Sequence, residues 1–528
     1  MSELKPVGQY DFSGGENSSV NPYLLQKNQS QRINNMMLTE TGSLRTRDGT
    51  SVVYNGNSVL TSTEIDRVGV YNQYGSFGLT AIPVAVLLHK VYDLRTTPWT
   101  LIGTMSADPS STIYPLQLVN FVNKILISHG AFSAPYSWDG TTFSALTDTG
   151  AANNLIPQMA AIMINYNGYV YLMNTGLNNT TYAAHGATAN IGPSSINSSD
   201  FNNPNSWPTS AQLYLNEYDG QKITGAGVFT VAETGIAPSQ VLIVFKDFGT
   251  YQVTGLINGG SPQAIQVKTD MGCSGHSTIQ FIAGYGMIRL THKGFGLYDG
   301  LNDTVISDSI RFRIFNGFGS AGIDFTQAYT AQSTQIQNPP TYICAVSMNG
   351  DALGLLSTVF ICDLRTMAWT VNTFANAIYS LSRLESPSTL PVIVGGDYVI
   401  SGFAQIRRMF ASDATDDGTA VSWSVTPQPA FAQTPIDRAY FRRALVDIVA
   451  TGTPAQITAQ FFYGATSKTI NKTPQNRTQD SVIPFDLGFI ANNAYPTISG
   501  TGPVTLRGLE YHLIQKPMTR STIAVGDN

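Results

Sequence analysis

Short apolar runs of strand length recur along the chain and are separated by turn-forming residues. The clearest runs are bounded by Gly, Pro, Asn or Asp, and they are Val84–Leu88, Phe121–Ile127, Tyr169–Met173, Val241–Phe245, Phe281–Leu290 and Tyr342–Val346. Regular short strands at this density predict a sandwich, a barrel or a propeller. The pattern starts at about residue 51 and predicts an all-β body over residues 51–436.

Asn-Gly and Asp-Gly pairs punctuate these runs over most of the length. They include Asn55-Gly56, Asp139-Gly140, Asn167-Gly168, Asp219-Gly220, Asp299-Gly300, Asn349-Gly350 and Asp417-Gly418. Both central positions of a type I′ hairpin turn need a positive φ, which these dipeptides adopt at little cost. The pairs therefore favour an all-β fold with few helices.

One eight-residue segment occurs twice with six identities, as Asp93–Thr100 and as Asp363–Thr370. We interpret each copy as a hairpin in which Asp and Thr cap the turn and the Trp fills the space between stacked sheets. Looser relatives are Tyr136–Phe143 and Gly296–Gly300. A recurrent turn with an aromatic residue is typical of a β-propeller, and 270 residues between copies fit about six blades of roughly 45 residues. Two copies leave the number of blades open.

Three regions differ from the predicted propeller body. Residues 1–50 are polar and poorly periodic, which predicts an extended N-terminal arm lying on the body or on neighbouring subunits. Within this arm Gln26–Thr39 could form a short helix, with Ile33, Met36 and Met37 on one side. Residues near 175–208 are rich in Asn, Ser, Thr, Ala and Gly and predict a loop-rich insertion. Residues 437–528 carry a new strand series, which either closes the propeller or forms a small β domain.

Charge is scarce along the chain. Charged residues make up 12% of it, against about 25% in typical proteins, and the net charge is −5. No long basic run occurs, so sequence-specific nucleic-acid binding gains no support, although a mildly acidic wall would let DNA pass without holding it. The chain also lacks an apolar run of about 18 residues and a signal-peptide core, so we expect cytoplasmic synthesis and no membrane insertion.

A search for chemistry begins with the three cysteines and six histidines. Cys273, Cys344 and Cys362 have no ligand-type spacing, which predicts buried reduced thiols, and no histidines are spaced for a metal. Cys273 and His276 share a Gly-rich turn. A nucleophile and a base three residues apart rarely align, and no third orienting group is visible. We interpret this segment as a tight turn with a half-buried thiol.

The remaining candidates are weaker. Gly284-Tyr285-Gly286 and Gly294-Phe295-Gly296 do not join a strand to a helix, as phosphate-binding loops do. The acidic pair Asp416-Asp417 resembles a fragment of a calcium loop without its distal Glu, so a structural cation is not favoured. Arginine pairs at Arg407-Arg408 and Arg442-Arg443 would place one Arg on each face of a strand, in salt bridges. The five tryptophans, Trp99, Trp138, Trp207, Trp369 and Trp423, are expected in the core.

Acidic residues are sparse and form no recurring pair of the kind that glycan hydrolysis needs. We therefore expect no enzyme activity, no cofactor, and no catalytic, cofactor-binding or metal-binding residues.

Several loose motifs follow one another along most of the chain. They are Asp11–Gly15, Gly42–Gly49, Ser198–Pro208, Leu242–Asp247, Gly249–Val253, Gly272–Ser277 and Gly294–Gly300. In this order they resemble the tail hub, or nozzle, proteins of short-tailed bacteriophages. The family has no catalytic residues to carry over to this chain.

This resemblance implies a structural subunit of the virion tail, assembled in the cytoplasm of the host bacterium. It implies a homo-oligomeric, typically hexameric, ring below the portal and the adaptor (head-to-tail connector) proteins. Such a ring continues the channel for packaged double-stranded DNA, helps to retain that DNA, and serves as a platform for tail fibre or needle proteins. The alternative that we weigh is a receptor-binding or carbohydrate-binding β-propeller at the tail periphery.

Overall fold

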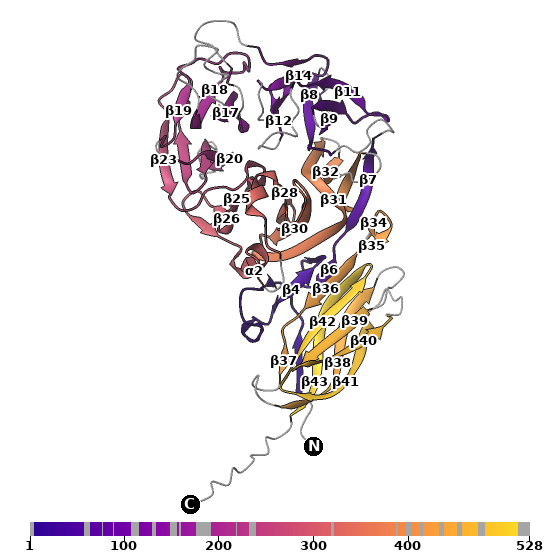
Figure 1. Cartoon of the computed structure of the whole chain (residues 1–528). Coiled ribbons are helices and arrows are strands. Elements are labelled where there is room, and N and C mark those ends of the chain that lie inside the picture. Colours follow the sequence, from indigo (N-terminus) through magenta and orange to yellow (C-terminus); the bar gives the residue numbers. More distant parts are fainter. Residues whose placement is uncertain are drawn as a thin grey trace, which may run out of the picture.

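The computed structural model shows a ring-shaped upper body and an elongated lower domain (Figure 1). It describes residues 5–56, 64–75, 78–87, 89–106, 116–128, 134–147, 156–157, 160–175, 192–217, 219–231, 239–317, 321–386, 389–397, 404–411, 415–431, 438–450, 457–473 and 481–515. The fold is all-β, as the apolar runs and turn dipeptides predict, with a propeller as the upper body.

Five separate four-stranded antiparallel sheets follow one another around the ring, and we number them as blades 1 to 5. Blade 1 consists of β8 (Arg67–Gly75), β9 (Gly78–Leu87), β10 (Lys90–Asp93) and β11 (Thr100–Thr104). Blade 2 consists of β12 (Gln117–Phe121), β13 (Lys124–Ser128), β14 (Tyr136–Trp138) and β15 (Phe143–Ala145). Blade 3 consists of β16 (Ile162–Tyr166), β17 (Tyr169–Thr175), β18 (Gly192–Ser198) and β19 (Gln212–Tyr214). Blade 4 consists of β20 (Ile223–Val231), β21 (Ser239–Lys246), β22 (Thr250–Thr254) and β23 (Gln263–Lys268). Blade 5 consists of β24 (Gln280–Ile282), β25 (Gly286–Thr291), β26 (Gly294–Tyr298) and β27 (Asp303–Val305).

Two further blades share one long strand, β31 (Ala368–Ser386). Its first part pairs with β30 and completes blade 6, which consists of β28 (Gln332–Gln337), β29 (Pro340–Val346), β30 (Leu356–Asp363) and β31. Its last part pairs with β32 (Thr389–Asp397) and begins blade 7, which continues with β33 (Gln405–Ala411). The outer strand of blade 7 is β7 (Gly49–Asn55), so a strand from early in the chain closes the last blade.

Apolar clusters join successive blades all the way around the ring. They lie between blades 1 and 2, 2 and 3, 3 and 4, 4 and 5, 5 and 6, and 6 and 7. Another cluster packs Val394 and Ile406 of blade 7 against Val68 and Leu87 of blade 1. The described residues therefore form a closed ring of seven blades, and the estimate of about six from the repeat spacing is wrong.

The repeated segment explains this difference. Asp93–Thr100 joins the third and fourth strands of blade 1, and Asp363–Thr370 does the same in blade 6, so 270 residues span five blade intervals. Insertions in blades 3, 4 and 6 raise the mean interval above roughly 45 residues.

Both copies of the segment have the same internal geometry. Asp93 Oδ1 accepts the backbone N–H of Arg95 at 2.9 Å, while Asp93 Oδ2 accepts its Nη2 at 2.6 Å. Asp363 holds Arg365 in the same way, at 3.0 and 2.6 Å. The Trp of each copy is buried between blades, and Trp369 stacks on Phe295 of blade 5 with ring centroids 4.7 Å apart. The predicted role of the Trp between stacked sheets is confirmed.

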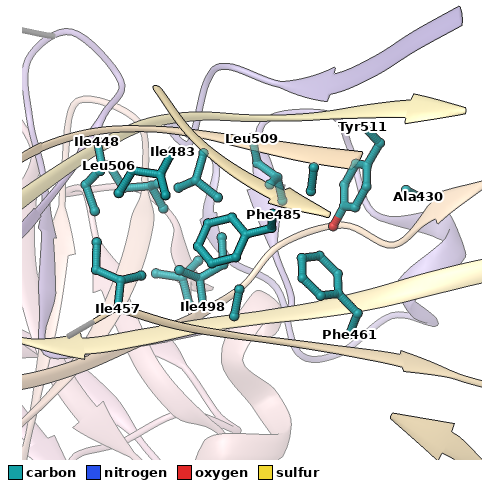
Figure 2. Packing of buried hydrophobic residues seen from close by; sticks show 14 of the residues in the cluster. Ala430, Ile448, Ile457, Phe461, Ile483, Phe485, Ile498, Leu506, Leu509 and Tyr511 are labelled. Atoms are coloured by element: carbon teal, nitrogen blue, oxygen red, sulfur yellow. The ribbon is translucent and has the colours of Figure 1, made fainter. Parts of the chain in front are cut away.

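The lower domain is a β-sandwich. One sheet has the order β41 (Ser481–Ala491), β38 (Ala439–Ala450), β43 (Val504–Gln515), β6 (Leu44–Thr46) and β5 (Met36–Leu38), with β1 (Lys5–Gln9) also paired to β43. The other consists of β4 (Arg32–Asn34), β36 (Ser422–Thr426), β42 (Asn493–Thr501), β39 (Ile457–Tyr463) and β40 (Thr466–Lys472), with β37 (Ala430–Phe431) on β42. Between them pack Ile457, Phe461, Phe485, Ile498 and Tyr511, among others (Figure 2).

The C-terminal strand series therefore lies in a small β domain, whereas the propeller is closed by β7. The segment predicted as an N-terminal arm contributes β1, β4, β5 and β6 to that domain, and its contact with neighbouring subunits stays a prediction. Of the predicted insertion near 175–208, residues 192–198 form β18 and Trp207 is buried between blades 2 and 3. Residues 176–191 lie outside the described part of the chain.

The helix predicted over Gln26–Thr39 is wrong. This stretch forms β3 (Gln29–Ser30), β4 and β5, and β2 (Gly15–Glu16) pairs with β3. Ile33 and Met36 are both buried in the sandwich core, while Asn34 pairs with strands of both the propeller and the sandwich. Long-range strand pairing overrides the weak local helix preference here.

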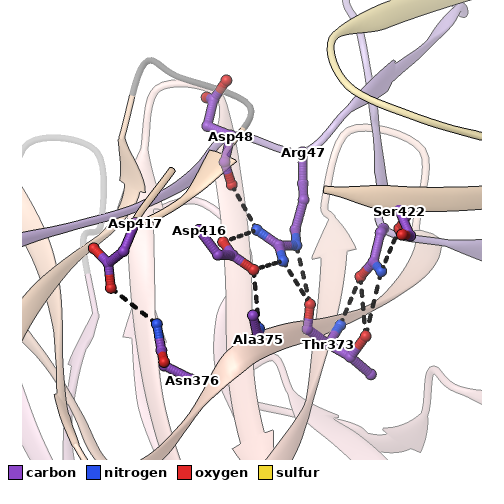
Figure 3. A network of polar contacts seen from close by, with 9 residues as sticks. Arg47, Asp48, Thr373, Ala375, Asn376, Asp416, Asp417 and Ser422 are labelled. Carbon is purple, nitrogen blue, oxygen red and sulfur yellow. Dashed lines mark hydrogen bonds and ion pairs between the residues drawn. The ribbon is translucent and has the colours of Figure 1, made fainter. Parts of the chain in front are cut away.

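A buried ion pair fastens the sandwich to the propeller (Figure 3). Arg47, between β6 and β7, donates to both carboxylate oxygens of Asp416 in β34 (Thr415–Asp416), at 2.9 and 2.6 Å. The Arg47 side chain is 2% exposed and that of Asp416 is 4% exposed. The guanidinium also donates to the Thr373 carbonyl at 3.1 and 2.7 Å and lies 4.0 Å from the Phe374 ring centroid. The guanidinium thus joins β34 and β31 to the segment between β6 and β7.

Asn35 adds a second link at this joint. Its side-chain oxygen accepts the Thr373 N–H at 2.7 Å, and its side-chain amide donates to the Ser422 carbonyl at 2.7 Å (Figure 3). Thr373 belongs to the propeller strand β31 and Ser422 to the sandwich strand β36. One amide therefore ties the edges of the two bodies together.

We expect Phe461→Ala to lower the free energy of unfolding of the sandwich by about 3 to 5 kcal/mol, because it leaves a large cavity in the core. Phe461 is fully buried, whereas its neighbour Phe462 is 41% exposed on the other face of the same strand. Phe462→Ala is therefore the matched control, with an expected loss below about 1 kcal/mol. Denaturant unfolding followed separately for the two domains measures both, and equal losses would contradict this assignment of faces.

We expect Asp416→Asn to destabilise the joint by about 3 to 5 kcal/mol, since it leaves the Arg47 guanidinium buried without a counter-charge. The control is Asp48→Asn, which breaks the partly exposed pair with Arg45 and should cost at most about 1 kcal/mol. Hydrogen exchange at Thr373 and Ala375 provides the readout, because Ala375 donates its N–H to Asp416 at 2.9 Å. Unchanged exchange in Asp416→Asn would refute the role of this pair.

Candidate functional site

The innermost strands of the blades all begin at one end of the propeller axis, which we call the mouth. Each blade is an antiparallel meander of four strands, so each new blade starts at the same end as the one before. Among the residues that begin or precede these strands are Glu64, Asp66, Arg67, Gln117, Gln280 and Gln332. Polar side chains of several blades therefore lie together at the mouth.

Three glutamines at the mouth connect neighbouring blades. Gln117 donates to the Ala161 carbonyl at 2.5 Å and accepts the Met163 N–H at 2.6 Å, which links blade 2 to blade 3. Gln280 reaches from blade 5 to blade 6 by donating to the Ser333 carbonyl at 3.0 Å. These glutamines hold the innermost strands together through backbone groups.

Gln332 does the same from blade 6. Its side-chain oxygen accepts the Leu381 N–H of blade 7 at 3.1 Å. All three glutamines occupy the first position of an innermost strand. The blades differ in length, so the three glutamines are not evenly spaced in the sequence and form no recognisable repeat.

Arg67 extends this network across the mouth. Its Nη1 donates to Gln332 Oε1 at 2.6 Å, so blade 1 contacts blade 6 over the start of blade 7. Burial lowers the pKa of Arg67 to about 10, which leaves the guanidinium charged at neutral pH.

Glu64 and Tyr379 complete the mouth. Burial raises the pKa of Tyr379 well above its usual value, and the charges of Asp66 and Glu64 raise it further. Burial also raises the pKa of Glu64, while its hydrogen bond with Tyr379 lowers it. Because the phenol stays protonated, it is a hydrogen-bond donor to the carboxylate and has no nucleophilic character.

The Cys273–His276 turn lies at the start of blade 5 and cannot form a nucleophile–base pair. Burial raises the pKa of the Cys273 thiol to about 11. Burial and the nearby charge of Arg67 lower the pKa of His276 to about 4. The thiol points to the Gly275 carbonyl at 3.2 Å, and His276 Nδ1 accepts the Ala226 N–H at 3.3 Å. The interpretation as a tight turn stands, but its thiol is fully buried rather than half-buried.

A cavity of about 220 Å³ adjoins this turn, with Lys222, Asp247, His276 and Tyr329 in its lining. Asp247 accepts the backbone N–H of Lys222 at 3.1 Å. The raised pKa keeps the Cys273 thiol protonated, and the lowered pKa makes the neutral His276 imidazole a weak base, so the two do not form an activated nucleophile beside the cavity.

The two Gly-aromatic-Gly segments are structural parts of blade 5. Gly284-Tyr285-Gly286 forms the turn between β24 and β25, and Gly294-Phe295-Gly296 lies within β26. Neither segment leads into a helix, which agrees with the weak phosphate interpretation. All three cysteines are buried free thiols, and all five tryptophans are buried, both as predicted.

The acidic pair and the first arginine pair are joined to each other. Asp416 is held by Arg47, while Asp417 forms an ion pair with Arg407 and accepts the Asn376 amide at 2.9 Å. Both carboxylates therefore have cationic partners from the protein itself. Arg407 is buried and Arg408 exposed, as the prediction of opposite faces requires.

The second arginine pair departs from that prediction. Arg442 and Arg443 are both exposed, because a β-bulge between Phe441 and Arg443 interrupts the alternation of faces. Arg443 donates to Asp486 at 2.9 Å on the sandwich surface.

Throughout the described part of the chain, every charged side chain of a residue at most 8% exposed has a partner of opposite charge. The pairs are Glu16–Arg313, Arg47–Asp416, Asp93–Arg95, Asp219–Lys246, Asp303–Arg289, Asp363–Arg365 and Asp397–Arg407. In these same residues no group of three or more His, Cys, Asp or Glu side chains could hold a metal ion. No described helix is long and apolar enough to cross a membrane.

Comparison with known proteins gives similarity at the level of structure alone. No protein family and no curated protein matches the sequence. The structure is similar to BBS1N in its complex with ARL6DN, at 10% identity, over 69% of this chain and 96% of that chain, with a TM-score of 0.40.

It is also similar to two enzymes. One is the exo-beta-1,3-galactanase of Phanerochaete chrysosporium, at 10% identity, over 78% of this chain and 96% of that chain, with a TM-score of 0.26. The other is the GH32 beta-fructofuranosidase of Bombyx mori, at 8% identity, over 88% of this chain and 94% of that chain, with a TM-score of 0.26. Similarity this low carries no argument about activity, and the expected absence of enzyme activity stays a prediction.

We expect the stability of the propeller to depend on His276 between pH 4 and 6.5. The folded state holds the pKa of His276 at about 4, below its usual 6.5, so the unfolded state binds more protons in this window. The free energy of unfolding should therefore fall as the pH drops, by up to about 1.4 kcal/mol per pH unit. His276→Gln should remove this component and His512→Gln, on the sandwich, should not. Identical pH slopes in the wild type and His276→Gln, measured by denaturant unfolding, would contradict it.

Proposed function

We propose that this chain is a structural, non-enzymatic subunit of the tail of a short-tailed bacteriophage, and that it forms the hub or nozzle ring. The observation that carries the non-enzymatic part is the pairing of every buried charge among the described residues. A catalytic carboxylate or base needs a free, tuned proton site, and these groups are instead neutralised by fixed partners. The resemblance of the ordered motifs supports the tail role.

The architecture supports a mechanical task. A propeller closed by β7 cannot open without breaking the β7–β33 ladder and the cluster between blades 7 and 1. The joint at Arg47 and Asn35 fixes the sandwich to this ring through buried contacts. A rigid two-domain subunit of this kind suits a structural assembly that carries mechanical load without a conformational change.

The central channel for DNA would be the lumen of the assembled ring. At the mouth of a single propeller, Arg67 of blade 1 donates to Gln332 of blade 6. Few charged groups line the innermost strands, and Arg67, Arg383 and Glu385 are those on β8 and β31. The DNA channel therefore belongs to the space between copies rather than to one copy.

We expect the purified chain, of 56.9 kDa, to form a closed homo-oligomer, most simply a hexamer, in native mass spectrometry at micromolar concentration. Negative-stain images of the same sample should show a ring with a central lumen. A strictly monomeric species at all concentrations would count against the proposal. Saturable binding on a glycan array by that monomer would instead favour the peripheral carbohydrate-binding alternative.

A further inference from the structure

The cavity beside the Cys273–His276 turn lies at the mouth of the propeller, where four neighbouring blades begin. Its volume is about 220 Å³. Ile162 and Ile223 in its lining are the first residues of the innermost strands of blades 3 and 4. The Cys273–His276 turn precedes the innermost strand of blade 5, and the 3₁₀ helix η5 (Phe325–Thr330) precedes that of blade 6. Four blades therefore contribute to one space at the mouth.

Four half-buried side chains bring polar atoms to this cavity, and they are Asp247, Ser274, His276 and Tyr329. Asp247 Oδ2 accepts the Lys222 N–H at 3.1 Å, which leaves Oδ1 without a hydrogen-bond partner among the described residues. In the same part of the chain the hydroxyl groups of Ser274 and Tyr329 have no partner either. Polar atoms of this kind that meet at one cavity need a partner from outside the protein.

His276 adds a hydrogen-bond donor to the lining. Its Nδ1 accepts the Ala226 N–H at 3.3 Å, so the proton of the neutral ring is on Nε2. The pKa of about 4 keeps the ring neutral at pH 7. The described residues provide no acceptor for Nε2–H. Since neither ring nitrogen has a lone pair available, His276 is suited to a ligand that accepts a hydrogen bond and not to a metal ion.

The walls that carry these groups are fixed by the fold. Gly275 lies so close to η5 that a Cβ atom on it would be 2.4 Å from the Ala328 carbonyl oxygen. The Thr278 hydroxyl donates to the Gly275 carbonyl at 2.7 Å and holds the turn from the other side. Lys246, which precedes Asp247, is fully buried and donates to Asp219 at 2.7 Å. The site is therefore organised before a ligand arrives, which lowers the entropy cost of binding.

The lining also specifies the chemistry of the ligand. It contains one cation, Lys222, and one anion, Asp247, so its net charge is zero and a neutral ligand is favoured. A carboxylate accepts hydrogen bonds and His276 Nε2–H donates one, and hydroxyl groups match both because they donate and accept. Phe325 and Tyr329 of η5 add aromatic surface, against which the C–H face of a ring can pack. The cavity is smaller than the roughly 300 to 1,000 Å³ of pockets for drug-sized molecules, which limits the ligand to about one ring.

We propose that this cavity binds one neutral sugar ring, with its hydroxyl groups on Asp247, Ser274, His276 and Tyr329. The sugar is either a free monosaccharide or the end of a glycan chain, because both present the same ring. This site is independent of the tail role. A closed ring of subunits that binds no sugar contradicts this inference alone, and sugar binding by that closed ring leaves the tail role intact.

The experiment titrates the full chain, by ligand-observed NMR, with D-glucose, D-galactose, D-mannose, N-acetyl-D-glucosamine and the methyl glycosides of these four sugars. We expect saturable binding of at least one of them. Asp247→Asn should weaken it by about tenfold or more, and Tyr329→Phe by about threefold or more, because each removes hydrogen-bonding capacity from the cavity. Thermal unfolding at the wild-type midpoint verifies that each variant is folded.

Two matched controls make the same chemical changes outside the cavity. Asp270→Asn alters a carboxylate whose side chain is 54% exposed, and Tyr285→Phe alters a phenol in the turn between β24 and β25, at the opposite end of blade 5. Both should bind the sugar as the wild type does. Glycerol, which has hydroxyl groups but no ring, should bind at least about tenfold more weakly than the sugar.

The methyl glycosides distinguish the two sources of the sugar. Their anomeric oxygen is blocked as it is in a glycan, so their binding identifies the end of a glycan chain, while binding of free sugars alone identifies a monosaccharide. Absence of saturable binding by all eight sugars overturns the proposal. Unchanged affinity in folded Asp247→Asn and Tyr329→Phe, or glycerol binding as tight as that of the sugar, overturns it as well.

Discussion

A sheet that is apolar on both faces must be covered on both faces, and this constraint shapes the whole upper body. Each blade has neighbours on two sides, so a row of blades leaves two exposed apolar faces at its ends unless the row closes. The cluster between blades 7 and 1 removes those ends. Closure depends on β7, which comes from the beginning of the chain and pairs with β33 from near residue 408.

The same closing strand determines where the second domain lies. Arg47 stands immediately before β7, and the strands that precede it, β4 to β6, belong to the sandwich. The chain thus enters the sandwich, crosses to close the propeller, runs around seven blades and returns to complete the sandwich. Where the chain crosses between the two bodies, the buried Arg47–Asp416 pair and the Asn35 amide hold the joint.

Buried charge is used in this protein to fix the positions of segments that pack together. Arg47, Lys246 and Arg289 are each almost completely buried, and each satisfies its charge with one carboxylate and further oxygen acceptors. Replacing such pairs by apolar residues is often neutral in stability, so their value lies in specifying which segments meet.

The sequence by itself determined the all-β fold, the propeller, the Asp–Trp hairpin and the core role of the tryptophans, because these depend on local turn chemistry and short-range periodicity. Asp139 and Gly140 form a turn in which Asp139 accepts the Thr142 N–H, and Asp93 caps its own loop. Only the tertiary structure decided the seventh blade, the strands at residues 29–38, the glutamine bridges at the mouth and the joint at Arg47. Each of these pairs residues that lie tens to hundreds of positions apart, and no local pattern encodes such a partner.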